Sequence, residues 1–308
     1  MVYNINTSSR NGVKKEGNIF IMIYVLFNTL AGNKNLEQET DALQNFFNSE
    51  IIKKDIKSID YKTFLAPLTE NDTLVLCGGD GTLNRFANDT EGMDIACEIL
   101  YYPSGSGNDF AHDIGIEPHG KPVSVKEYLQ DLPTVEVKGK TYRFINNVGF
   151  GIDGYCCEVG DECKKKSDKP VNYTAIAIKG LLFCYKPTNA TVVIDGESYT
   201  YKKVWLAPTM KGRYYGGGMI ATPAQDRKNP DGKLSVMIFH GSSKLRTLMI
   251  FPSIFKGEHI QHEKFVTIHT GHDISVKFDR PTALQIDGET VLGVTEYKAA
   301  AKMPATIA

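Results

Sequence analysis

Apolar runs of strand length alternate with helical periodicity in the first part of the chain. Four runs have the length of buried strands: Ile19–Phe27, Ser58–Phe64, Thr73–Leu76 and Ile99–Tyr102. Between them, apolar residues recur at the spacing of a helix face: Leu36, Leu43, Phe46 and Phe47, and then Leu83, Phe86 and Ala87. The capping-box pattern Ser124-x-x-Glu127 predicts the start of one more helix. Strands that alternate with helices are typical of βαβ units, so this region predicts a mostly parallel sheet.

The pattern changes at Pro133, where period-two alternation and hairpin turns take over. Turns are predicted at Gly139-Lys140 and at Asp195-Gly196-Glu197, each flanked by alternating apolar residues. Further strands are predicted at Leu234–Phe239, Phe265–His269 and Ile274–Phe278, and a helix at Tyr173–Tyr185. The second half is therefore predicted to be an antiparallel β domain, with the domain boundary near residue 133.

Composition and charge argue against several classes of protein. The 308 residues carry 35 Lys and Arg against 36 Asp and Glu, which argues against a nucleic-acid partner. The six cysteines include no C-x-x-C pair, so free thiols and a cytoplasmic location are expected. No apolar run reaches the ~20 residues of a membrane helix. Residues 1–18 are polar and patternless, and are interpreted as a disordered extension.

A glycine-rich turn, Gly78-Gly79-Asp80-Gly81-Thr82, follows the third strand and precedes a helix. Such a turn brings backbone N–H groups to a helix N-terminus, where phosphate oxygens bind well. Asp80 would hold Mg²⁺ against the phosphates, because magnesium prefers carboxylate and water oxygens. The alternative is an ordinary tight turn in which Asp80 caps the helix.

A second polar loop, Gly105-Ser106-Gly107-Asn108-Asp109-Phe110, follows the fourth strand. In open α/β sheets, ligands bind at the carboxyl ends of the strands. The alternative is a loop that leads into an Asn-capped helix. Two loops of this kind on neighbouring strands favour a binding site.

Between Ile19 and about Glu296 the chain resembles the diacylglycerol kinase catalytic-domain family of lipid kinases, close to the soluble bacterial members and distantly similar to NAD kinases. The two loops carry most of this resemblance, although Ser106 replaces the family's threonine and Arg85 stands where glutamate is usual. The segment Phe27-Asn28-Thr29-Leu30-Ala31-Gly32 resembles the family's phosphate loop, with Thr29 in place of a proline. Asn147-Val148-Gly149-Phe150-Gly151 resembles the segment that opens the β-rich domain.

The resemblance implies a set of site residues. Those that would bind the nucleotide are Asn28, Gly32, Thr63, Gly78, Gly79, Asp80, Gly81, Thr82, Gly105, Ser106, Asn108 and Asp109. Asp231, with the carbonyls of Lys228 and Lys233, would hold a structural Mg²⁺ in the turn Pro230-Asp231-Gly232. In Gln285-Ile286-Asp287-Gly288-Glu289, Asp287 would accept the proton of the lipid hydroxyl and Glu289 would help to orient the site. Asp-Gly-Glu also occurs at 195–197, so the tripeptide alone indicates no chemistry.

The implied fold is α/β: a Rossmann-like, NAD-kinase-like parallel-sheet domain at 19–133, and an antiparallel β-sandwich domain at 134–291 that takes the lipid. The segment 292–308 is expected to return to the first domain, with the active site between the two. The implied reaction uses ATP and Mg²⁺ to phosphorylate a lipid hydroxyl, most simply that of diacylglycerol, giving phosphatidic acid. The alternatives are a kinase of another lipid, a kinase of a soluble NAD-like substrate, and an inactive nucleotide- or lipid-binding module.

The implied enzyme contacts the inner membrane face peripherally to reach its lipid substrate, and a homodimer is one expectation because family members are often dimers. Three further features have ordinary interpretations. Lys164-Lys165-Lys166 is interpreted as a solvated loop that could also meet anionic lipid heads. Cys156-Cys157 lacks the spacing of metal ligands. An apolar stripe from Leu245 to Phe255 is interpreted as core, with a lipid-facing edge as the alternative.

Overall fold

The computed structural model describes residues 13–15, 19–28, 36–47, 49–167 and 171–302. The chain forms two compact units. The first comprises the described residues up to Gly105 together with Ile116–Glu127, and the second comprises Ser106–Gly115 together with the described residues from Tyr128 onward. The sequence boundary near residue 133 thus lies a few residues late. The polar loop that begins at Gly105 crosses from the first unit to the second.

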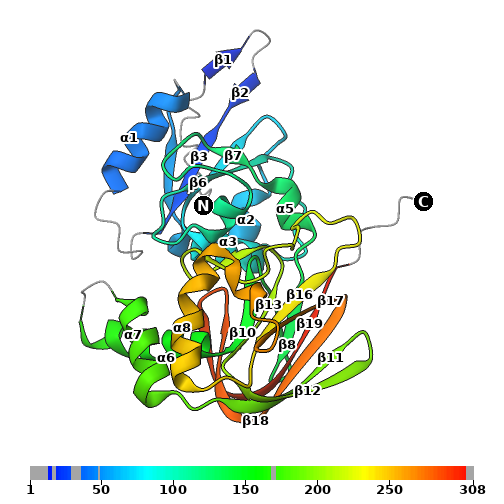
Figure 1. The fold of residues 1–308 in the computed structure, drawn as a ribbon. Coiled ribbons are helices and arrows are strands. Elements are labelled where there is room, and N and C mark those ends of the chain that lie inside the picture. Colours follow the sequence, from blue (N-terminus) through cyan, green and yellow to red (C-terminus); the bar gives the residue numbers. More distant parts are fainter. Residues whose placement is uncertain (1–12, 16–18, 29–35, 48, 168–170, 303–308) are drawn as a thin grey trace, which may run out of the picture. The chain divides into compact units, whose positions relative to one another are not determined.

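The first unit is built on a five-stranded sheet in the order β4-β3-β5-β6-β7 (Figure 1). Its strands are β3 (Ile23–Phe27), β4 (Ile52–Asp55), β5 (Thr73–Gly78), β6 (Glu98–Pro103) and β7 (Val123–Ser124). All neighbouring pairs are parallel except β6 with β7. Helices α1 (Leu36–Phe47), α2 (Tyr61–Leu65) and α3 (Asp80–Asp89) accompany it, and α5 (Lys126–Gln130) spans the division between the units.

Both faces of this sheet are apolar, as expected for a parallel sheet that is covered by helices. Val25 and Val75 share one core cluster with Leu43 of α1. The neighbouring residue Leu76 points to the opposite face, and Phe86 of α3 is buried as well. The predicted alternation of strand and helix is confirmed here.

Two local predictions in this unit are wrong. The run Ser58–Phe64 is not a strand: the strand is β4, followed by the 3₁₀ turn η1 (Ile56–Ser58) and α2. Asp55 and Asp60 explain this, because their carboxylates accept N–H groups two and three residues ahead and so favour helical turns. Ser124 lies in β7, with its hydroxyl bonded to Glu98, and so does not cap α5.

The predicted strand Ile19–Phe27 is divided at Met22, whose N–H donates to the carboxylate of Asp72 at 3.1 Å. Its first part, β2 (Ile19–Ile21), pairs with β1 (Val13–Lys15), so part of the expected extension is a hairpin. Residues 1–12 and 16–18 lie outside the described residues.

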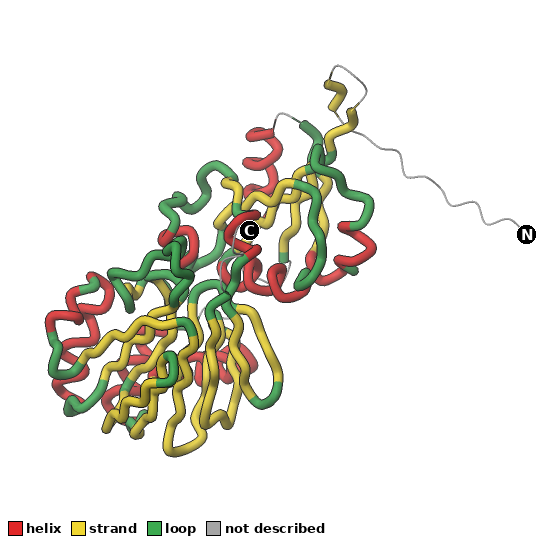
Figure 2. The backbone as a smooth tube through the Cα atoms, turned by 90° about the vertical axis from the view of Figure 1, so that its right-hand side faces the viewer, coloured by secondary structure: helices red, strands yellow, loops and turns green. Residues whose placement is uncertain are grey.

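The second unit is a ten-stranded antiparallel sheet in the order β17-β16-β13-β10-β18-β19-β8-β9, with β11 pairing with β12 and β18. Its strands are β8 (Thr134–Val137), β9 (Lys140–Arg143), β10 (Asn147–Gly151), β11 (Thr188–Ile194), β12 (Glu197–Val204), β13 (Leu206–Met210), β16 (Leu234–Phe239), β17 (Val266–Gly271), β18 (Asp273–Ile286) and β19 (Glu289–Ala300). The long strand β18 pairs with β11 through its first half and with β10 through its second half, and its register with β19 shifts between them. This irregularity lets one sheet curve around its own core (Figure 2).

Two cores lie on the two faces of this sheet. On β16, Val236 and Ile238 belong to the inner core, whereas Met237 and Phe239 belong to the core beneath the helices. The helices are α4 (Asp109–Asp113), α6 (Ile152–Lys166), α7 (Tyr173–Lys179), the π-helical turn η2 (Gly180–Cys184), α8 (Lys244–Ile250), η3 (Phe251–Lys256) and η4 (Glu258–Gln261), with a small ribbon of β14 (Tyr214–Tyr215) and β15 (Met219–Ile220).

Three expectations for the second half need correction. Residues 292–300 lie in β19, which pairs with β18 and β8, so this part of the C-terminal segment stays in the second unit. Lys164–Lys166 end α6 and are not a loop, and cations are favourable at that end of a helix. The first hairpin turns at Lys138-Gly139, both with positive φ, one residue earlier than predicted.

Candidate functional site

The carboxyl ends of the parallel strands gather the residues that the sequence assigned to phosphate binding. Asn28 follows β3, Gly78 ends β5, and Ser104 follows β6. The N–H of Ser104 donates to the carbonyl of Gly78 at 3.0 Å, so the two glycine-rich loops begin side by side. Gly32 lies outside the described residues.

Helix α3 starts at this edge with a glycine cap. Gly79 is its N-cap and makes no side-chain cap hydrogen bond, and Asp80 is its first residue. A Cβ on Gly78 would stand 2.3 Å from the hydroxyl oxygen of Thr82, so a side chain does not fit where the turn closes on the helix. A helix N-terminus with a glycine cap suits an anion such as a phosphate group.

Other sequence-assigned residues near this helix have local partners. The Thr63 hydroxyl donates to the Asp60 carboxylate, and both residues form the start of α2. Arg85, at the family's usual glutamate position, is exposed and pairs with Asp89 at 3.3 Å. Arg85 is therefore an exposed helix residue, and such a pair adds only a few tenths of a kcal/mol.

In the second unit, Asp109 holds a glycine turn. Its carboxylate accepts the N–H groups of Gly217 at 2.8 Å and Gly218 at 2.7 Å, and its side chain is buried. Asn108, directly before it, has φ 48°, a conformation that asparagine tolerates better than most residues. The geometry thus gives Asp109 an organising role within the second unit.

An ion cluster around the buried Asp113, which the sequence did not indicate, lies in the same unit. Asp113 accepts from Arg213 at 2.9 Å and from Arg227 at 2.8 Å. The Arg227 guanidinium also donates to the side chain of Asn146 at 2.8 Å and lies 4.8 Å from the ring of Phe110. It therefore ties α4 to the loop before β10.

We expect Asp113→Ala to lower the free energy of unfolding by about 3–5 kcal/mol, because it leaves the 5 % exposed Arg227 side chain without its counter-charge. Urea denaturation measures this loss. The control is Asp131→Ala, which removes an exposed pair with Lys302 and should cost about 1 kcal/mol or less. Equal losses in the two variants would show that the cluster does not stabilise the unit.

Asp287 binds the loop that precedes β10. Its carboxylate accepts the backbone N–H groups of Ile145, Asn146 and Asn147, the last two at 2.8 and 2.9 Å. Asp195, in the other Asp-Gly-Glu, does the same for the loop before β18, accepting from His272 at 2.9 Å and Asp273 at 2.8 Å. Both aspartates have positive φ and use their carboxylates to fix a neighbouring loop.

The two glutamates of these tripeptides differ in their surroundings. Glu197 accepts the hydroxyl of Tyr199 at 2.6 Å. Glu289 begins β19 with an exposed side chain, two residues after the anchored Asp287. In the second tripeptide, Glu289 is therefore the exposed carboxylate, and the hydrogen bonds of Asp287 hold the turn next to it.

The turn at Asp231 is held by contacts within the protein. The carbonyl of Lys233 accepts amide N–H groups from Gln225 at 2.9 Å and Asn229 at 3.0 Å, and the Asp231 carboxylate lies 3.4 Å from the Lys233 ammonium. The N–H of Lys228 donates to Asp226. Two of the three oxygens assigned to Mg²⁺, the carbonyl of Lys233 and the carboxylate of Asp231, thus have partners within the protein, and the Mg²⁺ site at this turn stays a prediction.

Asp153, near the start of α6, is a buried acid that belongs to none of the sequence motifs. Its carboxylate accepts the N–H of Gly154 at 2.8 Å and the amide of Gln285 at 3.3 Å. Burial raises the pKa of Asp153 from its ordinary value of 3.8 to about 7. Its only sequence signal is its place two residues after the Gly149-Phe150-Gly151 segment.

This raised pKa makes stability depend on pH. Between about pH 4 and pH 7 the unfolded chain loses the Asp153 proton while the folded chain keeps it, so the stabilisation present below pH 4 is lost as pH rises. A shift of about three units corresponds to about 4 kcal/mol. We expect Asp153→Asn to gain about this much relative to the wild type between pH 4 and pH 8, measured by urea denaturation. Parallel pH curves for the two proteins would contradict the burial argument.

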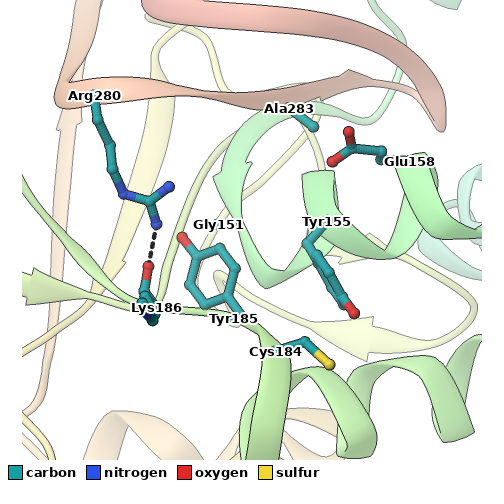
Figure 3. Close-up of a pocket in the computed structure, with 8 residues that line it drawn as sticks. All are labelled: Gly151, Tyr155, Glu158, Cys184, Tyr185, Lys186, Arg280 and Ala283. Carbon is teal, nitrogen blue, oxygen red and sulfur yellow. Dashed lines mark hydrogen bonds between the residues drawn. The ribbon is translucent and has the colours of Figure 1, made fainter.

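A cavity of about 170 Å³ lies in the second unit beside α6 and η2 (Figure 3). Its lining residues are Gly151, Tyr155, Glu158, Cys184, Tyr185, Lys186, Arg280 and Ala283. Arg280 donates to the carbonyl of Lys186 across it, and the buried Tyr185 hydroxyl has no partner among the described residues. The cavity is smaller than the roughly 300–1,000 Å³ of sites for drug-sized ligands, so it would hold only part of a lipid.

Within the described ranges, no helix is long and apolar enough to cross a membrane. The same residues contain no cluster of three or more His, Cys, Asp or Glu side chains placed to hold a metal ion, Cys156 and Cys157 included.

Comparison with known proteins matches each half of the chain to a family model. Residues 22–137 match the diacylglycerol kinase catalytic domain, and residues 146–306 match the YegS C-terminal NAD kinase beta sandwich-like domain. A Staphylococcus aureus strain JH9 protein, provisionally named a lipid kinase, is 30% identical over 233 residues, 72% of each chain. A diacylglycerol kinase of Mycobacterium tuberculosis strain H37Rv is 26% identical over 226 residues, 71% of each chain.

A solved diacylglycerol kinase structure from Bacillus anthracis strain Sterne has the same fold. It superposes with a TM-score of 0.57 at 15% identity, covering 91% of this chain and 94% of that one. With both family models matched in order along the sequence, the chain belongs to the lipid kinase family defined by the diacylglycerol kinase catalytic domain and its C-terminal β-sandwich.

Proposed function

We propose that this protein transfers the γ-phosphoryl group of ATP to the hydroxyl of diacylglycerol, giving phosphatidic acid and ADP. ATP enters as its Mg²⁺ complex, so the metal is part of the substrate. The observation that carries the proposal is the turn at 287–289, where Asp287 is anchored by three backbone N–H groups and Glu289 is exposed beside it. Family membership supports the same reaction class.

The nucleotide binds at the carboxyl edge of the first unit's sheet. The backbone of Gly78–Thr82 presents the N-terminus of α3 to the phosphates, and Asp80 contacts the Mg²⁺ that accompanies them. Phosphoryl transfer depends mainly on positioning and charge neutralisation, which a short glycine turn and one carboxylate can supply.

The acceptor hydroxyl must lose its proton as its oxygen bonds to the γ-phosphorus. Glu289 takes this proton, and the bond between the γ-phosphorus and the oxygen that bridges it to the β-phosphate breaks as ADP leaves. Asp287 positions Glu289 through the loop it holds. These roles reverse those implied by the resemblance, because the Asp287 oxygens are engaged with backbone donors.

The experiment that tests the acceptor is a panel of hydroxyl compounds incubated with γ-labelled ATP. Diacylglycerol, monoacylglycerol, a sphingoid base, phosphatidylglycerol, undecaprenol and NAD are compared at equal concentration. We expect label in phosphatidic acid at the highest rate. Faster labelling of another lipid would change the acceptor, label in NAD would favour a soluble substrate, and no label would favour a binding module.

A further inference from the structure

The second unit has an apolar surface formed by large hydrophobic side chains that remain exposed instead of packing into its core. Helix α7, labelled with α8 in Figure 1, runs directly into η2, and η2 contacts α8. The ammonium of Lys244, the first residue of α8, donates to the carbonyl of Leu182 in η2 at 3.2 Å. These elements therefore form one continuous surface.

Four large apolar side chains project from this surface, and we call them the outer patch. Phe183 is 74 % exposed, Leu245 67 %, Met249 60 % and Ile178 43 %. Leu245 and Met249 lie one turn apart on α8, so they share a face. The opposite face of α8 packs inward, with Ile250 only 2 % exposed. The apolar stripe from Leu245 to Phe255, which the sequence predicts to be core, therefore contributes both buried and exposed residues.

Within its own two segments the outer patch has charges of one sign, whereas α6, which contacts α7 and η2, contributes Glu158 beside the neighbouring cavity. Residues 173–186 and 241–257 contain no Asp or Glu. The same stretches contain five basic residues, all exposed: Lys179, Lys186, Lys244, Arg246 and Lys256. Segments that combine exposed apolar side chains with Lys and Arg are typical of surfaces that lie in the interface of an anionic membrane.

We propose that the outer patch docks on an anionic phospholipid bilayer, with Phe183, Leu245 and Met249 inserted among the lipids and the basic residues against the head groups. This inference deepens the proposed function, because the bilayer is where a diacyl acceptor resides. Cys184, Tyr185 and Lys186 line the cavity of Figure 3 and directly follow Phe183, so that cavity adjoins the docking surface.

A second copy of the chain fits this surface less well. In a symmetric dimer the same patch meets itself, so the five basic residues would face one another with no acid in either segment. An anionic bilayer supplies the missing negative charge. The charge pattern therefore favours lipid over self-association.

The test is co-sedimentation of the full chain, without nucleotide, with vesicles of phosphatidylglycerol and phosphatidylcholine or of phosphatidylcholine alone. We expect the triple variant Phe183→Ser, Leu245→Ser, Met249→Ser to lose at least ~tenfold in partitioning, since three large apolar side chains no longer insert. Leu292→Ser, which changes an exposed leucine elsewhere in the unit, is the control and should bind as the wild type does.

Charge is tested separately. Lys179→Gln with Arg246→Gln should lower partitioning onto the anionic vesicles by roughly fivefold per charge, and should have little effect on neutral vesicles. Lys140→Gln with Lys202→Gln removes the same charge from exposed positions outside the surface and is the control. Equal losses in the two pairs would overturn the proposal in favour of a net-charge effect.

Measurements of kinase activity distinguish a failure of the docking proposal from a failure of the proposed function. If docking is correct, the triple variant loses transfer to diacylglycerol in vesicles but keeps transfer to a short-chain, water-soluble diacylglycerol. A wild type that binds vesicles through the patch yet phosphorylates no lipid would support docking and contradict the kinase assignment. Unchanged vesicle binding by the triple variant would overturn docking, as would a dimer in sedimentation analysis that the triple variant abolishes.

Discussion

Replacing Glu289 by Gln should lower the rate of phosphoryl transfer by ~10²–10⁴, the usual contribution of a general base. The amide keeps the size of the side chain and removes only its ability to take a proton. Because Glu289 is exposed, stability should change by no more than about 0.5 kcal/mol. Steady-state kinetics with diacylglycerol and a urea melt measure the two effects, and the loss should appear in kcat with KM for ATP little changed.

The chain supplies a matched control for this result. Glu197 occupies the same place in the other Asp-Gly-Glu hairpin, where it accepts the Tyr199 hydroxyl. Glu197→Gln should therefore leave phosphoryl transfer at the wild-type rate. If the two variants have equal activity, the assignment of Glu289 as the base is wrong.

Asp80→Ala should reduce kcat/KM for ATP by on the order of 10²–10³, as loss of one preorganised electrostatic contact does elsewhere. Asp80 is the first residue of α3, beside the glycine cap at the carboxyl edge of the sheet. Without its carboxylate, the Mg²⁺ of the incoming ATP loses a protein ligand, so half-maximal activity should also need more Mg²⁺. Kinetics over a range of Mg²⁺ concentrations measure both effects.

The control for Asp80 lies at the other end of the same helix. Asp89 is the last residue of α3 and forms an exposed ion pair with Arg85. Asp89→Ala removes the same charge from the same element, and should leave kcat/KM for ATP near the wild-type value. Unchanged Mg²⁺ and ATP dependence in Asp80→Ala would place the nucleotide elsewhere.

The parallel sheet could be predicted from the sequence because buried strands such as Thr73–Gly78 are continuous apolar runs that end in glycine. The strand predicted from Ser58 to Phe64 is wrong because Asp60 caps a helix there. A short capped helix and a short strand can have the same residue composition. Strand β19 was placed in the wrong unit because its pairing with β8 joins residues more than 150 positions apart, which no local pattern records.

In the candidate site, too, local motifs could be predicted from the sequence, whereas contacts between residues far apart in the sequence could not. The glycine turn at 78–82 is a local motif, and the structure places it at the expected sheet edge. The contacts of the Asp287 carboxylate are with the loop at 145–147, which is far away in sequence. Likewise, Asp113 and Arg227 meet only through folding, and neither has a motif that marks it.

The central claim, that this chain moves the γ-phosphoryl group of ATP onto a lipid hydroxyl, is tested most directly by parallel incubations with γ-labelled and α-labelled ATP. The purified full chain is mixed with diacylglycerol and Mg²⁺, and the lipids are extracted into organic solvent. Label should enter the organic phase as phosphatidic acid from γ-labelled ATP only, and Glu289→Gln should abolish it while Glu197→Gln does not. Label that stays entirely in the aqueous phase, or that enters the lipid from α-labelled ATP as well, would contradict the account.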